Sequence, residues 1–258
     1  MTIIEAIILG IIQGLAEFLP VSSSGHLMVF HRILGIESSD NLTFIVVLNL
    51  GTLIPLLYLF REDVLKLVKQ PFQKTVYLLI IATLPIVIAT VLFEDFVEGL
   101  FQSTQFLAFG FLATGIMLML TDSIKTNEKT IEKMSYLDGI VVGITQAVAI
   151  FPGLSRSGST ITALLVRGLT REEAAKFSFL MSIPASFGAL VFRIIRMFTG
   201  HINIAELNLL NLFTGFVAAA ISGYISINFM MKLIKTAKLK YFALFYVFGL
   251  TVLIFVLF

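Results

Sequence analysis

Two short polar segments interrupt apolar stretches of this sequence and carry its chemically capable side chains. The first segment contains Gln13, Glu17, the serines of residues 22–24 and His26. The second segment reads Pro152-Gly153-Leu154-Ser155-Arg156-Ser157-Gly158-Ser159-Thr160. Ionisable side chains inside hydrophobic segments are energetically costly and are usually retained for function. We therefore take these two segments as the candidate site.

The second segment has the composition of an anion site. A glycine-containing turn that opens a helix presents free backbone N–H groups, and the positive end of the helix dipole favours an anion. Serine and threonine hydroxyls add donors, and the planar guanidinium of an arginine suits phosphate oxygens. A helix cap alone would explain one hydroxyl, not four beside an arginine. The predicted phosphate-binding residues are Gly153, Ser155, Arg156, Ser157 and Thr160.

The first segment offers groups for a cation and for proton transfer. Gln13 and Glu17 are four residues apart and share one face of a helix, where they could hold a divalent cation together with phosphate oxygens. Alternatively, Glu17 forms a structural ion pair with Arg156. His26 could act as a base, or could only bond a backbone carbonyl. A nucleophile with a base, a cation and a phosphate cradle would suit hydrolysis of a phosphoric anhydride.

The composition places these segments in a membrane protein. Of the 258 residues, 58% are hydrophobic and 13% are charged, and the mean hydropathy is +0.99, so the chain lacks the polar surface of a soluble domain. The net charge of +2 is dispersed, which argues against nucleic acid as a partner. No cysteine is present, which excludes disulfides. The N-terminus has no leading basic residue or small-residue cleavage site, so we expect it to be part of the mature fold.

Six stretches are long and apolar enough to span a bilayer, which takes about 20 residues. They are residues 42–60, 75–93, 104–121, 175–195, 209–231 and 240–258. Two other apolar regions, 2–35 and 135–168, are broken by Pro20 and by Pro152 with the polar residues that follow each proline. Each of these regions predicts two half-length helices around a polar turn, which is the pattern of a re-entrant hairpin.

The two interrupted regions resemble each other. A shift of 133 residues aligns residues 10–25 with 143–158 without a gap and matches glycine, glutamine and serine positions. We predict one membrane domain over 1–258, with a first repeat of about 1–124 and a second of about 134–258. Three spans separate the hairpins, so the second copy enters from the opposite face. The expected fold is an all-α membrane protein with six transmembrane helices and two re-entrant helical hairpins in an inverted-topology internal repeat.

Loop charges predict the orientation of the chain. The loops within 61–74, 125–133 and 232–240 are basic, whereas residues 94–98 are acidic. Since cytoplasmic loops are enriched in Lys and Arg, both termini and the opening of the site are expected on the extracytoplasmic side. Arg193 and Arg196 then lie near the outer face, which is a mild exception to the rule.

The paired motifs resemble a known family. QGLAEFLPVSSSGH (13–26) and PGLSRSGST (152–160) are similar to the two signatures of the bacterial undecaprenyl-diphosphate phosphatases linked to bacitracin resistance, and SIPASFGAL (182–190) extends the resemblance. The resemblance implies a hydrolase in the bacterial plasma membrane. Its substrate would be the C55 lipid undecaprenyl diphosphate, whose terminal phosphate is removed to recycle the lipid carrier for cell-wall synthesis.

The resemblance also implies roles for individual residues. Ser23 falls where the proposed nucleophile lies, with His26 as its base or proton donor. Glu17 and Gln13 fall at the metal-associated element, and the cation is usually magnesium or calcium. The diphosphate element corresponds to Arg156, Ser155, Ser157 and Thr160. Two positions depart from the family pattern: Gln13, where many members have Glu, and Asn49, where members carry Gln.

A second class of function stays open at this point. Inverted repeats with broken helices are also typical of transporters, so the same site could serve a polyprenyl-phosphate flippase or secondary transporter. No P-loop spacing is present, so nucleotide-driven transport is unsupported. The expected partners are undecaprenyl diphosphate and membrane lipids. The sequence does not set the oligomeric state, and a homodimer stays open.

Overall fold

The protein is an assembly of helices. The computed structural model describes the whole chain except residues 37–40, 102, 125–127, 200–207, 237 and 258, and the described residues contain no sheet, only an isolated bridge between Lys129 and Leu169. The helices are α1 (Ile3–Phe18), α2 (Ser23–Ile33), α3 (Asn41–Leu59), α4 (Arg61–Lys69), α5 (Lys74–Phe101), α6 (Thr104–Thr121), α7 (Tyr136–Val148), α8 (Arg156–Val166), α9 (Arg171–Phe198), α10 (Leu209–Thr236), α11 (Lys240–Phe242) and α12 (Phe248–Leu257), with a 3-10 turn at Ile131–Lys133 and a π-helical turn at Ala243–Val247.

Several of these helices are suited to a membrane. The segment Lys74–Phe93 of α5 and the whole of α9 and α10 are long and apolar enough to cross a bilayer. Residues Thr43–Leu59 of α3 meet the same test only together with α4, from which they are bent by 85°. The apolar segments Gln105–Thr121 and α7 are shorter. The all-helical class and the apolar helices expected of a membrane protein are therefore confirmed.

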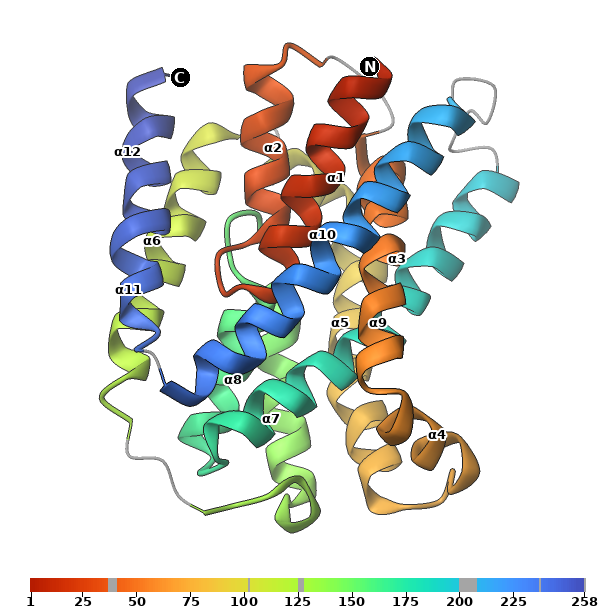
Figure 1. Cartoon of the computed structure of the whole chain (residues 1–258), viewed down its shortest axis with the longest axis vertical. Coiled ribbons are helices and arrows are strands. Elements are labelled where there is room, and N and C mark those ends of the chain that lie inside the picture. The colour runs from red at the N-terminus through yellow and green to blue at the C-terminus, as the bar shows by residue number, and fades with distance from the viewer. Residues whose placement is uncertain (37–40, 102, 125–127, 200–207, 237, 258) are drawn as a thin grey trace.

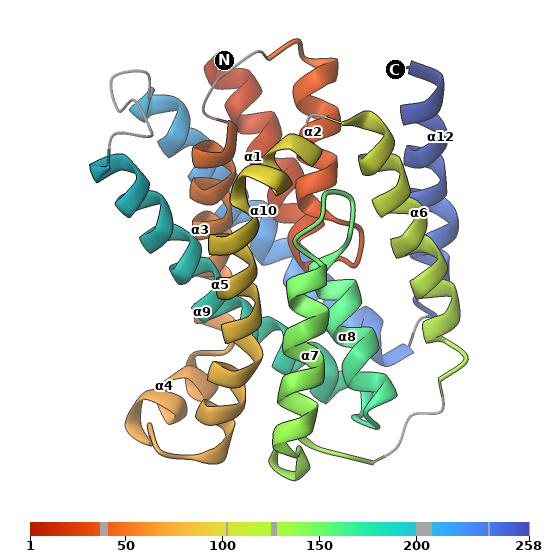
Figure 2. The same ribbon diagram turned by 180° about the vertical axis from the view of Figure 1, so that it is seen from behind.

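Two helical hairpins enter the molecule from opposite ends. Figures 1 and 2 show α1 and α2 descending from the end that carries both termini, and α7 and α8 rising from the other end, so that their turns meet near mid-height. The first break has a local cause, because a residue before proline avoids the helical region: Leu19, which precedes Pro20, is extended with ψ 148°. Ser22 and Ser155 then cap the second helix of each hairpin.

Each hairpin packs through small residues against a long helix from the other half of the chain. Helix α1 packs on α10, and α7 packs on α5. A methyl group added to Gly14 would lie 2.5 Å from the carbonyl oxygen of Ala219, and one added to Gly143 would lie 2.9 Å from that of Ala82. Glycine at such contacts lets helix backbones approach closely, which is a common basis of helix association in membranes.

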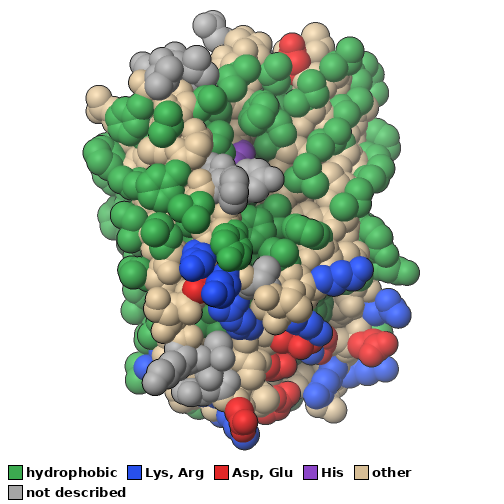
Figure 3. All heavy atoms as spheres, turned by 60° about the vertical axis from the view of Figure 1, so that its left-hand side comes forward, with side chains coloured by type: hydrophobic (Ala, Val, Ile, Leu, Met, Phe, Trp, Pro, Cys, Tyr) green, Lys and Arg blue, Asp and Glu red, His purple; other side chains and the backbone are tan. Residues whose placement is uncertain are grey.

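The charged side chains gather at one end. Figure 3 shows most of the visible Lys, Arg, Asp and Glu side chains on the lower part of this face, opposite the end with the termini, below a mainly apolar surface. At this end the fully buried Asp138 accepts from Lys129 Nζ at 2.5 Å and from Arg167 Nε at 2.6 Å. Parts of two predicted basic loops, residues 125–127 and 237, lie outside the described residues. The ion pairs of Asp138 connect the first turn of α7 to Arg167 at the end of α8, and so hold the two helices of the second hairpin together at this end.

Candidate active site

A polar cavity of about 160 Å³ lies where the two hairpin turns meet. Its walls come from α1, the start of α2, α3, and the turn and first residues of α8. The residues that line it are Ala16, Glu17, Ser22, Ser23, Ser24, Asn49, Ala149, Leu154, Ser155, Arg156 and Ser157. The cavity therefore joins the two polar segments singled out in the sequence.

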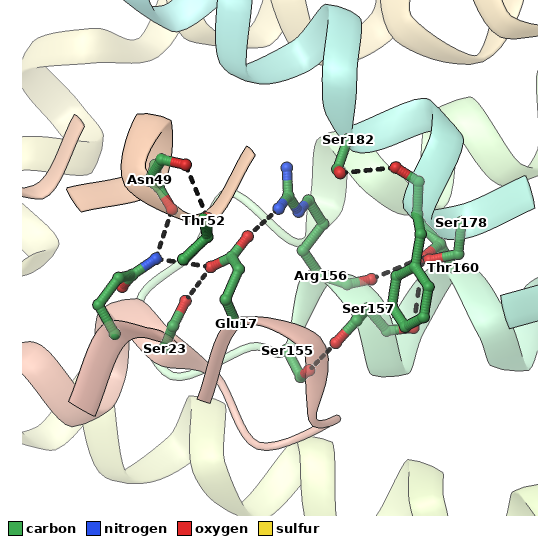
Figure 4. A network of polar contacts seen from close by, with 12 residues as sticks. Glu17, Ser23, Asn49, Thr52, Ser155, Arg156, Ser157, Thr160, Ser178 and Ser182 are labelled. Atoms are coloured by element: carbon green, nitrogen blue, oxygen red, sulfur yellow. Dashed lines mark hydrogen bonds and ion pairs between the residues drawn. The ribbon is translucent and has the colours of Figure 1, made fainter. Parts of the chain in front are cut away.

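Glu17 connects the two halves of this site. Its Oε2 accepts a hydrogen bond from Ser23 Oγ at 2.6 Å and another from Gln13 Nε2 at 2.8 Å. Its Oε1 forms an ion pair with Nη2 of Arg156 (Figure 4). Ser23 and Arg156 thus contact the two oxygens of one carboxylate, which places both within reach of a single diphosphate. The ion pair considered as the alternative role of Glu17 is present, alongside its contact with Ser23.

The turn before α2 is held in an unusual conformation. Ser22 has φ of 66° and is the only non-glycine residue with positive φ among the described residues. Such strain persists where surrounding contacts enforce it, and it is common at functional sites. The Oγ of Ser22 accepts from the N–H of Gly25 at 3.3 Å, and Gly25 packs on the ring of Phe111. This conformation puts Ser23 at the first position of α2, beside Glu17.

The turn before α8 is anchored by a threonine of α6. Thr114 Oγ1 donates to the carbonyl of Gly153 and accepts from the N–H of Ser155, both at 3.0 Å. Gly153 has φ of +83°, which favours glycine. The first N–H groups of a helix lack partners within the helix, and Arg156 and Ser157, which supply them in α8, both line the cavity. The arrangement suits an anion at this helix start.

Four predicted site residues do not line the cavity but support those that do. Gln13 is fully buried behind Glu17, and Gly153 shapes the second turn. Thr160 Oγ1 donates to the carbonyl of Arg156 at 2.9 Å and lies 2.6 Å from Ser178 Oγ. His26 Nδ1 lies 2.8 Å from the carbonyl oxygen of Ser22, so this nitrogen carries the hydrogen. In the neutral ring the lone pair is then on Nε2.

Sequence reasoning did not assign a role to several residues that hold the site. Asn49 Oδ1 accepts from Gln13 Nε2 at 2.5 Å, and Thr52 Oγ1 donates to the carbonyl of Asn49 at 2.6 Å. Thr114 and Ser178 contact the second hairpin from α6 and α9. The available signal was a polar residue within an apolar span, which marks an inward position but does not name its partner.

The oxygen donors fit a cation that is shared with the substrate. Magnesium sites often use one or two carboxylates and complete their coordination with phosphate oxygens and water. Glu17 supplies the carboxylate, and Gln13 Oε1 is a buried oxygen that has no hydrogen-bond partner among the described residues. The described residues contain no group of three or more His, Cys, Asp or Glu side chains that could hold a metal without other ligands. The cation of the predicted site would therefore depend on substrate oxygens.

Comparison with known proteins identifies similar sequences over nearly the whole chain. The model of the family described as "Bacitracin resistance protein BacA" matches residues 6–253. The undecaprenyl-diphosphatase of Carboxydothermus hydrogenoformans is 43% identical over 251 residues, covering 97% of this chain and 96% of the relative. The undecaprenyl-diphosphatase of Methanobrevibacter smithii is 43% identical over 264 residues, covering 94% and 93%. Undecaprenyl-diphosphatase 3 of Bacillus cereus is 40% identical over 251 residues, covering 97% and 95%.

Proposed function

The chain belongs to the bacitracin resistance protein BacA family, and we propose that it is a membrane hydrolase that converts undecaprenyl diphosphate to undecaprenyl phosphate and inorganic phosphate. The similarity to undecaprenyl-diphosphatases over almost their full length supports this reading over a transporter. The product is the lipid carrier used in cell-wall synthesis, so the activity recycles that carrier and gives resistance to bacitracin.

The observation that carries the proposal is the meeting of Ser23 and Arg156 on the carboxylate of Glu17. In the proposed reaction, Ser23 Oγ attacks the terminal phosphorus while Glu17 accepts its proton. The bond from that phosphorus to the bridging oxygen breaks, and undecaprenyl phosphate leaves with the bridging oxygen. Water then attacks the phosphoserine and releases inorganic phosphate, and the serine hydroxyl is restored. The alternative is a single attack by water oriented by Ser23.

The second hairpin would stabilise the charge on the transferred phosphate. Arg156 supplies the guanidinium, and Ser155, Ser157 and the first N–H groups of α8 supply neutral donors. Preorganised donors of this kind are usually the largest contribution to such catalysis. We assign His26 to proton transfer, as the family resemblance implies, and through Nε2, because Nδ1 is bonded to the carbonyl of Ser22. A divalent cation, magnesium or calcium, would be held by Glu17 and Gln13 with substrate oxygens and would neutralise phosphate charge.

We further propose that the fold has six transmembrane helices and two re-entrant hairpins related by an inverted repeat. The order of elements supports this, because each half of the chain contains a hairpin followed by three long helical segments. The accumulation of basic side chains at one end supports its placement in the cytoplasm. Both termini, and the opening of the site, would then be extracytoplasmic in the plasma membrane.

A phosphate-release assay on purified protein in detergent tests the proposal. We expect release from farnesyl or undecaprenyl diphosphate in the presence of magnesium or calcium. Ser23→Ala, Glu17→Gln and Arg156→Ala should each reduce it about 10²–10⁴-fold, the range for loss of a group that acts in the transition state. Ser182→Ala is the matched control, since that hydroxyl donates to the carbonyl of Phe179 in its own helix at 2.7 Å.

The assay also separates the hydrolase from a flippase, because transport cannot occur without a membrane. The assigned roles would be supported if the three variants lose phosphate release but keep the unfolding temperature of the wild-type protein. A correctly folded wild-type protein that releases no phosphate from either lipid would contradict the proposal. A phosphate label trapped on Ser23 would distinguish the covalent route from direct attack by water.

A further inference from the structure

A second cavity of about 160 Å³ adjoins the polar site. It lies between α5 and α9, and Asn49 and Arg156 line both cavities. Most of its other walls are apolar. The lining residues are Asn49, Ile86, Val87, Thr90, Val91, Arg156, Ala185, Ser186, Gly188, Ala189 and Phe192. The assigned chemistry uses only the first cavity, so the second has no role in it.

Arg156 has donors to offer to this second cavity. A guanidinium carries five N–H donors, and within the described residues only Nη2 of Arg156 has a partner, the carboxylate of Glu17. Figure 4 shows another guanidinium nitrogen directed away from Glu17. The side chain of Arg156 is 26% exposed, so it is accessible from the hollow that it borders. The guanidinium of Arg156 therefore lies between the polar first cavity and the largely apolar second cavity.

Two hydroxyl groups in the second cavity are unused by their own helices. Serine and threonine within helices often donate to the carbonyl of the preceding turn, as Thr83 does to Leu79 at 2.7 Å. Among the described residues, Thr90 of α5 and Ser186 of α9 make no such bond. The cavity thus combines free hydroxyl donors, unpartnered guanidinium donors and apolar walls, which suits an anionic group attached to a hydrocarbon chain.

We propose that the second cavity binds the phosphate that remains on the lipid, together with the first isoprenyl units. This inference rests on the proposed function. Arg156 then lies between the two phosphates, the terminal one beside Ser23 and the lipid-linked one beside Thr90 and Ser186. A lipid monophosphate can fill only one of these subsites at a time. When its phosphate occupies the second, nothing is presented to Ser23, so the product is not dephosphorylated further.

Kinetics with farnesyl diphosphate test this assignment. Loss of one hydrogen bond to a charged phosphate is expected to raise KM about tenfold, so Ser186→Ala and Thr90→Val should each do so while kcat stays within about twofold. Ser182→Ala and Thr83→Val are the matched controls, since they remove a hydroxyl from the same helices outside the cavity. Their KM should equal that of the wild type.

A third variant tests whether the free volume of the second cavity is needed for binding, independently of its hydroxyl groups. Among the described residues, a Cβ atom added at Gly188 would meet only Val87, at 3.8 Å, so Gly188→Ala places a methyl group in the cavity without a backbone clash. We expect it to raise KM for farnesyl diphosphate at an unchanged unfolding temperature. Wild-type KM in all three cavity variants would overturn the second subsite and leave the hydrolase intact. A wild-type protein without phosphate release would overturn both.

Discussion

At the scale of residues, the site depends on one carboxylate with several donors. Glu17 is 7% exposed and accepts from Ser23, Gln13 and Arg156. In this arrangement Glu17 holds Nη2 of Arg156 and leaves the other donors of that guanidinium to a diphosphate. Substrate phosphate therefore competes with Glu17 for Nη2 alone, and the proposed cation on Glu17 would weaken that ion pair.

Removal of this negative charge should separate binding from catalysis. In Glu17→Gln, Arg156 is no longer neutralised, so we expect tighter binding of inorganic pyrophosphate without added metal, measured by calorimetry in detergent, although phosphate release is lost. Arg156→Ala is the matched control and should weaken pyrophosphate binding. Weaker binding by Glu17→Gln than by the wild type would show that the ion pair does not restrain the arginine.

The sequence motifs predicted which residues gather here but not all of their contacts. Ser23 and Glu17 are separated by a turn whose course depends on the positive φ of Ser22, and helical spacing cannot reveal such a reversal. The family resemblance predicts His26 as the base or proton donor of Ser23, and the sequence left open that His26 only bonds a backbone carbonyl. That bond is present, from Nδ1 to Ser22, and Glu17 is the group beside Ser23; whether His26 also transfers a proton stays a prediction.

At the scale of elements, the hairpins depend on close helix contacts. A methyl group at Gly14 would lie 2.0 Å from Ser222 Oγ and 2.5 Å from backbone of α10. We expect Gly14→Ala to lower the free energy of unfolding by about 1–3 kcal/mol through overpacking, measured by denaturation in detergent. Gly249→Ala, where no atom of the described residues comes within 4 Å of the added methyl, should be neutral or stabilising by up to about 1 kcal/mol. Equal effects of the two variants would contradict the packing argument.

The buried cluster at the entry of the second hairpin predicts a larger effect. Asp138 is fully buried against Lys129 and Arg167, and loss of one member of a buried ion pair typically costs about 3–5 kcal/mol. Asp138→Asn should therefore lower the free energy of unfolding by that order. The exposed pair Lys235–Glu172, at 2.9 Å, provides the control, since Glu172→Gln should change it by less than about 1 kcal/mol. Similar values for both variants would contradict the structural role of Asp138.

Most helices could be predicted from hydropathy, because spanning segments need long apolar runs. The segment 104–121 coincides with α6, and 209–231 lies within α10. Hydropathy does not predict helix α4, because it indicates a basic loop over residues 61–74, whereas Arg61–Lys69 is helical. Helix α4 is short and amphipathic, so its average hydropathy is low. It is bent by 85° from α3, and hydropathy does not predict such a bend.

At the scale of the whole molecule, the opposed hairpins give the protein two distinct ends. Phe198 at the end of α9 and Phe72 between α4 and α5 are 87% and 83% exposed and lie towards opposite ends. Because the chain has no cysteine, Phe198→Cys and Phe72→Cys each create a single thiol. We expect an impermeant maleimide to label the first in intact cells and the second only after permeabilisation. The reverse pattern would invert the proposed orientation.

The 133-residue spacing predicted that the hairpins would oppose each other, because three spans separate them. It did not predict that α1 would pack on α10 and α7 on α5, which interleaves the two halves. Pairwise packing of this kind depends on surface shape at glycine positions, and hydropathy does not describe it. For the same reason the second cavity beside Arg156 could not be predicted from the sequence.

Helix α6 contacts the start of α2, through Phe111 against Gly25, and the turn before α8, through Gly110 and Thr114 against residues 152–155. One helix therefore spaces the two polar segments, although none of its described side chains lines the polar cavity. A genetic screen can detect this dependence. Second-site suppressors of a mild defect in one polar segment should map to α6, at positions where a small shift of the helix restores the spacing between Ser23 and Arg156.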